Sequence, residues 1–229
     1  MTDTRKRLHT SVLANKMGIP CFKNLRKYQD YSKLDGLHKG IPIHQNDDYG
    51  RLRRQHLLHK QALNDNLIRV SLPTDRPVEI LDSGTGDGFW MLDAAEEYPN
   101  ATLTGTDVSL MHLKQLKDFM PSNIFLREQN LSDRWLAVDE EKYDLVHQRY
   151  CLAQFSPEKG AQIVSDLFSL VKPGGFIQLL ESDMMSFDSG EGHEGMSEYM
   201  EFVDKAFSQV CSPASSSQYQ PLTIMQRLT

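Results

Sequence analysis

The sequence predicts an α/β protein built on a doubly wound, mostly parallel sheet. Between residues 78 and 181, short apolar strands alternate with helices, and three glycines at alternate positions directly follow the first strand. Strands alternating with helices of about 10–15 residues are typical of right-handed crossovers and of a parallel sheet covered on both faces. Ligands of such sheets bind beyond the carboxyl ends of the strands, so the glycines mark the first candidate site.

The composition is that of a globular domain, because the 229 residues are 39% hydrophobic and 24% charged. A continuous apolar run of about 18 residues is absent, which argues against a transmembrane helix. The N-terminus also lacks the apolar segment of a secretion signal. The three cysteines are far apart and the histidines show no metal-ligand spacing, so we expect no metal site and a reducing, cytoplasmic location.

Charge is unevenly distributed along the chain, whose net charge is −6. Residues 1–60 hold 13 Lys and Arg against 5 Asp and Glu, so residues 61–229 carry −14. A basic arm of this kind could bind nucleic acid or direct nuclear import, or it could be a solvated helical extension. Its basic residues are dispersed and few aromatics accompany them, which favours the solvated extension over nucleic-acid binding.

The first predicted helix spans residues 47–70, because apolar residues recur on one face and Asp48 can serve as its N-cap. Pro73 and Pro77 end it. The strands predicted beyond it are 78–82, 101–107, 123–129, 143–148 and 175–181, and the helices are 88–99, 109–120 and 156–171. The N-caps expected for the last two helices are Ser109 and Ser156.

The chain therefore divides into three predicted parts. Residues 1–45 form a basic extension or helical cap, residues 46–185 the ligand-binding domain, and residues 186–229 a helix followed by a loose tail. The helix is expected at 196–210, and the Ser-rich tail offers at best one poor strand, "LTIM". Residues 171–176, "VKPGGF", are expected to stop a helix and turn before the fifth strand.

The glycine run "EILDSGTGDGFW" is suited to a ligand that approaches the backbone closely. Gly84, Gly86 and Gly88 permit a tight turn that side chains would obstruct. The helix that follows offers free N–H groups and the positive end of its dipole to an anionic group. The dinucleotide pattern GxGxxG would need a third glycine where Phe89 stands, which argues against a dinucleotide cofactor.

Two polar residues after the next strands extend the candidate site. Asp107 ends the second strand, 19 residues past Gly88, where a carboxylate can accept both hydroxyls of a ribose. Its alternative role is a helix cap, which Ser109 fills better. Asn130 follows the third strand and could bond an adenine edge, or it could only form a turn.

In this order, the segments "ILDSGTGDG", "GTDVS", "YDLVHQR" and "LVKPGGF" resemble the class I S-adenosylmethionine-dependent methyltransferases. "RLRRQH" ahead of the glycines, with "HQR" behind them, more closely resembles the fungal LaeA-like methyltransferases of secondary metabolism. The resemblance covers about residues 47–183. It implies a Rossmann-like fold, the cofactor S-adenosyl-L-methionine, and methyl transfer to a hydroxyl or nitrogen of a small molecule.

The resemblance also implies which residues bind the cofactor, most of them at strand ends. They are Asp82, Gly84, Gly86 and Gly88 around the methionine part, Asp107 at the ribose, Val108 and the Leu131 backbone beside the adenine, Asn130 at the adenine amino group, and Gln148 beneath the methionine part. Arg51, Gln55 and His56 would lie on a helix that covers the site.

His147 is the candidate catalytic base, and it could instead be a strand histidine satisfied by its neighbours. Glu181 and Asp183, past the fifth strand, are alternative bases. A general base contributes roughly 10²–10⁴-fold when the acceptor must lose a proton. An "NPPY"-like run is absent after the fourth strand, which argues against methylation of planar exocyclic nitrogens.

The C-terminal part departs from the family pattern, which ends in a hairpin of a sixth and a seventh strand. Only 48 residues follow Glu181, and no such hairpin is recognisable, so we expect a truncated or divergent end and an open sheet edge. A homodimer or a protein partner could cover that edge. The alternatives to an enzyme are a LaeA-like nuclear regulator that acts through protein partners and a catalytically inactive truncated isoform.

Overall fold

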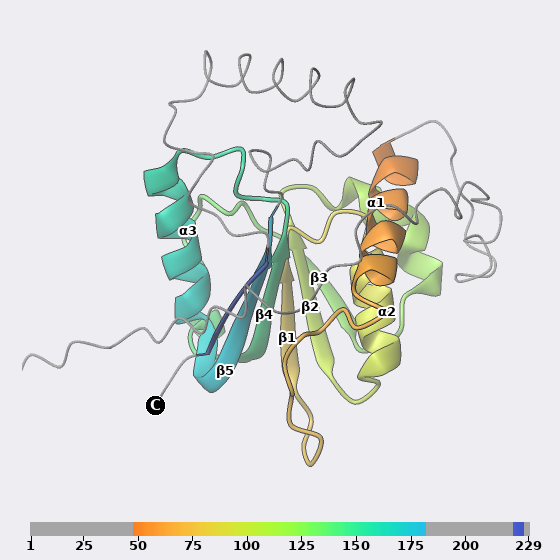
Figure 1. Cartoon of the computed structure of the whole chain (residues 1–229), viewed down its shortest axis with the longest axis horizontal. Helices are drawn as coiled ribbons and strands as arrows, with labels where there is room; N and C mark the ends of the chain where they lie inside the picture. The colour runs from red at the N-terminus through yellow and green to blue at the C-terminus, as the bar shows by residue number, and fades with distance from the viewer. Residues whose placement is uncertain (1–47, 182–221, 227–229) are drawn as a thin grey trace, which may run out of the picture. The chain divides into compact units, whose positions relative to one another are not determined.

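The computed structural model describes residues 48–181 and 222–226, which fall into two compact units divided between Asn130 and Leu131 (Figure 1). Our predictions for the basic extension, for Asp183 and for the helix at 196–210 lie outside the described residues. In the part of the chain that is described, no helix is both long enough and apolar enough to cross a membrane.

The unit that ends at Asn130 contains three parallel strands in the order β3-β2-β1. Ile80, Leu81 and Leu103 are fully buried in its core. Its strands are β1 (Glu79–Ser83), β2 (Thr102–Asp107) and β3 (Ile124–Glu128), and its helices are α1 (Asp48–Ala62), α2 (Phe89–Glu97) and the 3₁₀ helix η3 (Leu110–Phe119).

Two glycines let the helices of this unit approach the sheet and the loop closely. A Cβ atom on Gly105 in β2 would collide with the sulfur atom of Met91 in α2. A Cβ atom on Gly88 would lie 2.6 Å from a methyl carbon of Leu113 in η3, which packs with Leu116 against Phe89. The glycine run is therefore needed for packing as well as for its turn.

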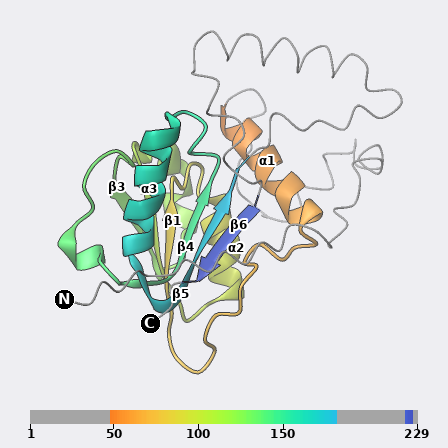
Figure 2. The ribbon, with the colours of Figure 1, turned by 60° about the vertical axis from the view of Figure 1, so that its left-hand side comes forward.

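The unit that begins at Leu131 contains two parallel strands, β4 (Tyr143–Arg149) and β5 (Val171–Leu180), with β6 (Leu222–Gln226) antiparallel to β5. A short 3₁₀ helix, η4 (Ala137–Asp139), precedes β4. Helix α3 (Pro157–Ser169) packs against β5 (Figure 2). It begins as predicted, because the Ser156 hydroxyl accepts a hydrogen bond from the Lys159 amide.

The alternation of parallel strands and helices confirms the predicted α/β class, but the structure differs from the prediction at three places. The first is the start of β5, which lies at Val171 instead of residue 175. Its pairing with β4 shifts from Tyr143–Val171 to Leu145–Phe176, so residues 172–175 form a bulge within the strand. "KPGG" is therefore part of β5 and not a separate turn before it.

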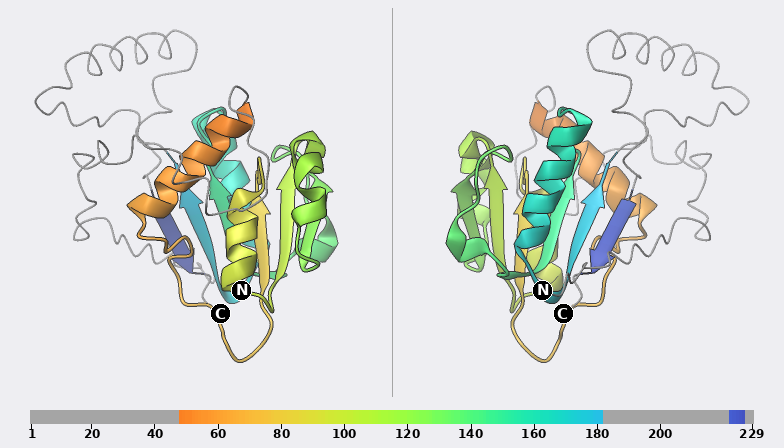
Figure 3. Two further views of the ribbon diagram at one scale, coloured as in Figure 1. Left: turned by 90° about the vertical axis from the view of Figure 1, so that its right-hand side faces the viewer. Right: turned by 90° about the vertical axis from the view of Figure 1, so that its left-hand side faces the viewer.

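The second difference is β6, within the tail that we expected to be loose. Both views in Figure 3 show it beside β5, with which it pairs from Phe176–Gln226 to Leu180–Leu222. The poor strand "LTIM" is therefore a strand, because the edge of β5 supplies the backbone partners that the segment needs. The edge of β5 is not open, and our reason for expecting a partner there is removed.

The third difference is α1, which ends at Ala62 instead of residue 70. Asn64 and Asp65 take left-handed backbone angles, with φ of 52° and 60°, and this conformation ends a helix. Leu67, which lies within the range predicted for this helix, is buried from the segment beyond it. Apolar periodicity alone did not distinguish these two arrangements.

Candidate functional site

The glycine loop is held at the carboxyl end of β1 by backbone and side-chain hydrogen bonds. Gly84 and Thr85 both donate their amides to the Thr106 carbonyl oxygen, over 2.8 Å each. The Thr85 hydroxyl donates to Asp82 Oδ2 over 2.7 Å. Asp82, which is buried, therefore orders the turn from inside. Residues 84, 86 and 88 have φ of 73°, 58° and 76°, which only glycine adopts readily.

Helix α2 starts directly after this loop, with Gly88 as its N-cap. Gly88 offers no side-chain cap, and the nearest substitute is a long contact of 3.4 Å from the Phe89 amide to Asp87 Oδ1. The other amides of the first turn have no partner within the helix, because intrahelical bonds begin only one turn later. This helix end is therefore suited to an anionic group.

Asp107 links the glycine loop to the start of η3. Its Oδ2 accepts the Gly86 amide over 2.9 Å, and its Oδ1 accepts the Ser109 amide over 3.2 Å. Ser109 in turn caps η3 through its hydroxyl, as predicted, by accepting the Met111 amide. Each carboxylate oxygen keeps a further lone pair, so Asp107 can hold the loop and still accept two hydroxyl groups.

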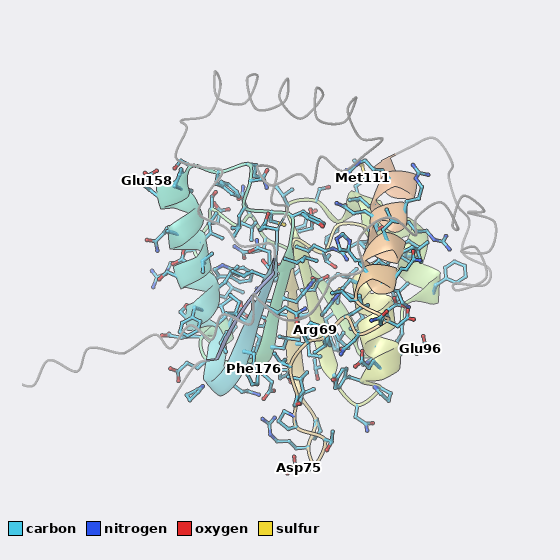
Figure 4. All side chains as sticks on the ribbon, viewed as in Figure 1. Arg69, Asp75, Glu96, Met111, Glu158 and Phe176 are labelled. Atoms are coloured by element: carbon cyan, nitrogen blue, oxygen red, sulfur yellow. The ribbon has the colours of Figure 1, made fainter. Side chains whose placement is uncertain are left out.

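An exposed apolar surface lies next to Asp107. Val108 is 69% exposed and Met111, labelled in Figure 4, is 61% exposed. Large apolar side chains so exposed are suited to cover a flat ring. Asn130 belongs to the same end of the unit, because the Gln129 amide donates to the Asp107 carbonyl over 2.8 Å. Asn130 is itself exposed.

Seven of the predicted cofactor residues thus lie together at the carboxyl ends of three adjacent parallel strands. They are Asp82, Gly84, Gly86, Gly88, Asp107, Val108 and Asn130. Leu131, His147 and Gln148 belong to the other unit and are described with it.

Helix α1 lies beside α2 and reaches the glycine loop (Figure 1). A methyl carbon of Leu52 lies 3.6 Å from where a Cβ atom on Gly86 would stand. Arg53 is buried, with its guanidinium carbon 4.8 Å from the centroid of the Phe89 ring. The sequence prediction overlooked Arg53, although its position three and four residues before His56 and Leu57 places it on their buried face.

His56 on α1 contacts Asp93 on α2. Its Nε2 lies 2.8 Å from Asp93 Oδ2, and Lys60 Nζ lies at the same distance from that oxygen. Burial raises the pKa of Asp93, but the hydrogen bonds from His56 and Lys60 outweigh burial and lower it. This buried group fixes α1 against α2, and so places Leu52 against the glycine loop.

In the unit that begins at Leu131, β4 carries His147 and Gln148 on opposite faces. His147 is only 2% exposed and pairs in register with Gln178, two residues before the strand ends. Gln148 is fully buried, and neither its amide oxygen nor its amide nitrogen has a hydrogen-bond partner among the described residues. A buried amide without partners is costly in a folded protein and indicates a polar ligand or a bound water.

Glu181 directly follows β5 and is 5% exposed. Its Oε1 accepts the amides of Cys151 and Leu152, over 3.0 and 3.1 Å. Burial raises the pKa of Glu181, and these two hydrogen bonds offset only part of the increase. Within residues 48–181 and 222–226, no group of three or more His, Cys, Asp or Glu side chains could hold a metal ion.

Residues 80–175 match the family model described as "Methyltransferase domain". The N-methyltransferase tcpN of Claviceps purpurea is 36% identical over 179 residues, which are 77% of this chain and 62% of that protein. Residues 80–175 therefore form a methyltransferase domain. The resemblance in the motifs is thereby confirmed. The cofactor of this family is S-adenosylmethionine.

Two further relatives come from Leptosphaeria maculans and Cochliobolus heterostrophus. The N-methyltransferase sirN of Leptosphaeria maculans is 36% identical over 68% of this chain and 54% of its own length. The secondary metabolism regulator LAE1 of Cochliobolus heterostrophus is 28% identical over 73% of this chain and 54% of its own length. The chain thus spans between about half and two thirds of these relatives.

Among solved structures, an O-methyltransferase family protein from Burkholderia thailandensis has the same fold. It is 15% identical, with a TM-score of 0.50, and the match covers 89% of this chain and 70% of that one. The residues of the methyltransferase domain fit the cofactor. Asp107 has lone pairs for two ribose hydroxyls, Val108 offers an apolar surface, and the start of α2 can receive a carboxylate.

Proposed function

We propose that this protein transfers a methyl group from S-adenosyl-L-methionine to a nitrogen atom of a small molecule of secondary metabolism, with a hydroxyl as the alternative acceptor. The observation that carries the proposal is the Asp107 carboxylate, bonded to the Gly86 amide at the exposed end of β2. The choice of nitrogen is supported by the two relatives at 36% identity, both named N-methyltransferases.

The cofactor supplies a methyl group that is already activated by a positively charged sulfur. The protein's task is then to align two molecules and to exclude water. Asp107 would hold the ribose hydroxyls, and the amides of the glycine loop and of α2 would hold the carboxylate. Val108 would cover one face of the adenine, and Asn130 would bond its amino group. Gln148 would offer its buried amide to the polar end of the methionine part.

Cofactor binding is tested by thermal shift with S-adenosylhomocysteine against NADH. A ligand at 100 times its dissociation constant adds about 2.7 kcal/mol to the free energy of unfolding, which such an assay resolves easily. We expect a shift with S-adenosylhomocysteine. Stabilisation by NADH alone would contradict the proposal.

Transfer is tested by incubating the full chain with isotope-labelled S-adenosylmethionine and the low-mass fraction of a fungal extract. A product heavier by one CH₂ group and carrying the label is expected. The position of the label on nitrogen or oxygen, read by NMR, decides the acceptor atom. We propose that this reaction takes place in the cytoplasm.

A regulatory role is the second candidate, favoured by the 28% identity to a protein named as a secondary metabolism regulator. It would use protein partners, and the basic residues 1–60 would assist nuclear import. Nuclear accumulation that depends on those residues, together with cofactor binding but no labelled product, would favour the regulator over the enzyme.

A further inference from the structure

Glu181 is a carboxyl group with two unequal oxygens. Oε1 accepts two backbone amides, from Cys151 and Leu152, which belong to the segment that leads from β4 to α3. Tyr150, directly before them, has a φ of 54°, which non-glycine residues seldom adopt. Glu181 Oε1 therefore fixes the course of the chain where it leaves β4.

Oε2, by contrast, accepts no hydrogen bond from the residues that the structure describes. The side-chain hydrogen bonds of Glu181 within them are the two on Oε1. The residue as a whole is 5% exposed, but Oε2 is not among the buried polar atoms that lack a partner, so this oxygen keeps access to the surface. Oε2 can therefore accept a hydrogen bond from a bound ligand.

The position of this oxygen agrees with that of a substrate group. In open parallel α/β sheets, ligands bind outside the carboxyl ends of the strands. Glu181 stands one residue beyond the carboxyl end of β5, whereas His147 lies two residues inside β4 and is paired in register with Gln178. Of the two candidate bases that the structure describes, Glu181 is the one at the carboxyl end of its strand.

We propose that Glu181 binds the N–H group of the methyl acceptor through Oε2 and receives its proton during transfer. This inference rests on the proposed function. The lone pair of the acceptor nitrogen forms a bond to the methyl carbon, while the carbon–sulfur bond breaks and leaves its electron pair on sulfur. The nitrogen proton passes to Oε2 and then to solvent, so the charges balance.

The surroundings of Glu181 suit a proton acceptor. Burial disfavours the charged carboxylate and so raises the pKa of Glu181. A carboxylate with a raised pKa is a stronger base. A base works best when its pKa lies close to the working pH. The two amides on Oε1 also hold the group in one orientation, so the direction in which Oε2 meets a donor is set before a ligand binds.

The test compares Glu181→Gln with Glu181→Ala and with Glu140→Gln, which alters an exposed residue. The side-chain oxygen of Gln can still accept the two amides, so Glu181→Gln keeps the chain anchor and removes only the basic oxygen. We expect Glu181→Gln to bind S-adenosylhomocysteine with wild-type affinity and to lose about 100-fold or more in kcat, measured by label transfer to the acceptor found in the extract. Glu140→Gln should retain wild-type kcat.

The outcomes separate the proposals. If Glu181→Gln keeps its kcat within threefold of wild type and only Glu181→Ala fails, Glu181 anchors the chain and the proposed role is wrong. If Glu181→Gln loses cofactor binding, the residue is structural and the proposal is again overturned. If the wild-type chain binds S-adenosylhomocysteine but labels no acceptor, the methyl-transfer function fails, and the role of Glu181 with it.

Discussion

The two units of this protein treat their polar strand ends differently. In residues 48–130, the side chains at the loop are bonded to the protein itself, with Asp82 on Thr85 and Asp107 on Gly86. In residues 131–181, both amide atoms of Gln148 are buried without a partner among the described residues, and the two side-chain hydrogen bonds of Glu181 are both on Oε1. Asp82 and Asp107 are thus held in place by the protein itself, whereas the Gln148 amide is not.

The first unit also contains buried polar groups without a partner among the described residues. Ser83 and Thr106 face each other across β1 and β2. Both hydroxyls are buried and have no partner among the described residues. A hydroxyl costs less to leave unbonded than an amide or a carboxylate, and a single bridging water can satisfy both. Because Asp82 and Asp107 bond to the protein itself, we expect mutations of the loop to change both the stability and the cofactor affinity. Mutations of Gln148 should change the cofactor affinity without lowering the stability.

The largest effect is expected for Gly88→Ala in the glycine loop. The new Cβ would stand 2.6 Å from a methyl carbon of Leu113, at a φ of 76°. Backbone strain costs about 1–3 kcal/mol, and overpacking adds a cost of similar size. Gly174→Ala, in the β5 bulge, is the matched control, since its φ is 82° but no described atom lies within 4 Å of the new Cβ.

Urea unfolding of the two variants measures the difference. Gly174→Ala should lose only the strain component, and Gly88→Ala the packing component as well. Equal losses in the two variants would show that Leu113 yields at no cost and that the loop of the first unit is not tightly packed.

Asp107→Ala should weaken the binding of S-adenosylhomocysteine by about 1.5–3 kcal/mol, the value of a hydrogen bond to a charged group. It should also destabilise the free protein, because the Gly86 and Ser109 amides lose their acceptor. Asp133→Ala, which alters an exposed carboxylate, is the control. Calorimetry that finds unchanged affinity in Asp107→Ala would mean that this carboxylate only orders the loop.

The residues of the glycine loop could be predicted from the sequence, whereas the surroundings of β4 could not. Asp82, the glycines and Asp107 could be found from sequence, because a tight turn after a strand restricts which residues are possible at fixed spacing. The state of Gln148 depends on what surrounds β4, which no local pattern contains. The same holds for β6, a strand only because β5 offers it an edge, and for the bulge at residues 172–175.

The contacts of α1 show a second limit of prediction. Its location near the loop followed from the resemblance, but Arg53, His56 and Lys60 all carry polar groups that could equally face solvent or ligand. Burial of His56 and Arg53 is decided by Asp93 and Phe89 on α2, 37 and 36 residues away along the chain. Pairings at that separation are not visible in the periodicity of either helix.

Gln148→Met should separate stability from binding. Replacing a buried amide that lacks partners with an apolar side chain of similar size should leave the free energy of unfolding unchanged or raise it by roughly 1 kcal/mol. Affinity for S-adenosylhomocysteine should fall by about tenfold, the worth of one hydrogen bond. Gln178→Met is the control, because Gln178 makes interactions within the protein and its loss should destabilise. A destabilised Gln148→Met with normal affinity would assign Gln148 to the fold.

The smallest effect expected is a difference in how two buried carboxyl groups respond to pH. The pKa of Asp93, in the first unit, is lowered in the folded state, so its stabilising contribution is present above the ordinary value of 3.8 and is lost as the pH falls below it. The pKa of Glu181, in the second unit, is raised, so its contribution is present below the ordinary value of 4.5 and is lost as the pH rises through the folded-state pKa.

Unfolding free energies of Asp93→Asn and Glu181→Gln, each compared with wild type from pH 3 to pH 8, measure both trends. The deficit of Asp93→Asn should shrink toward the acid end, and Glu181→Gln should gain on wild type as the pH rises above 4.5. Parallel profiles would mean that the two carboxyls have equivalent surroundings, and the inferred difference between the ion-paired Asp93 and the Glu181 carboxyl, whose pKa burial raises, would be wrong.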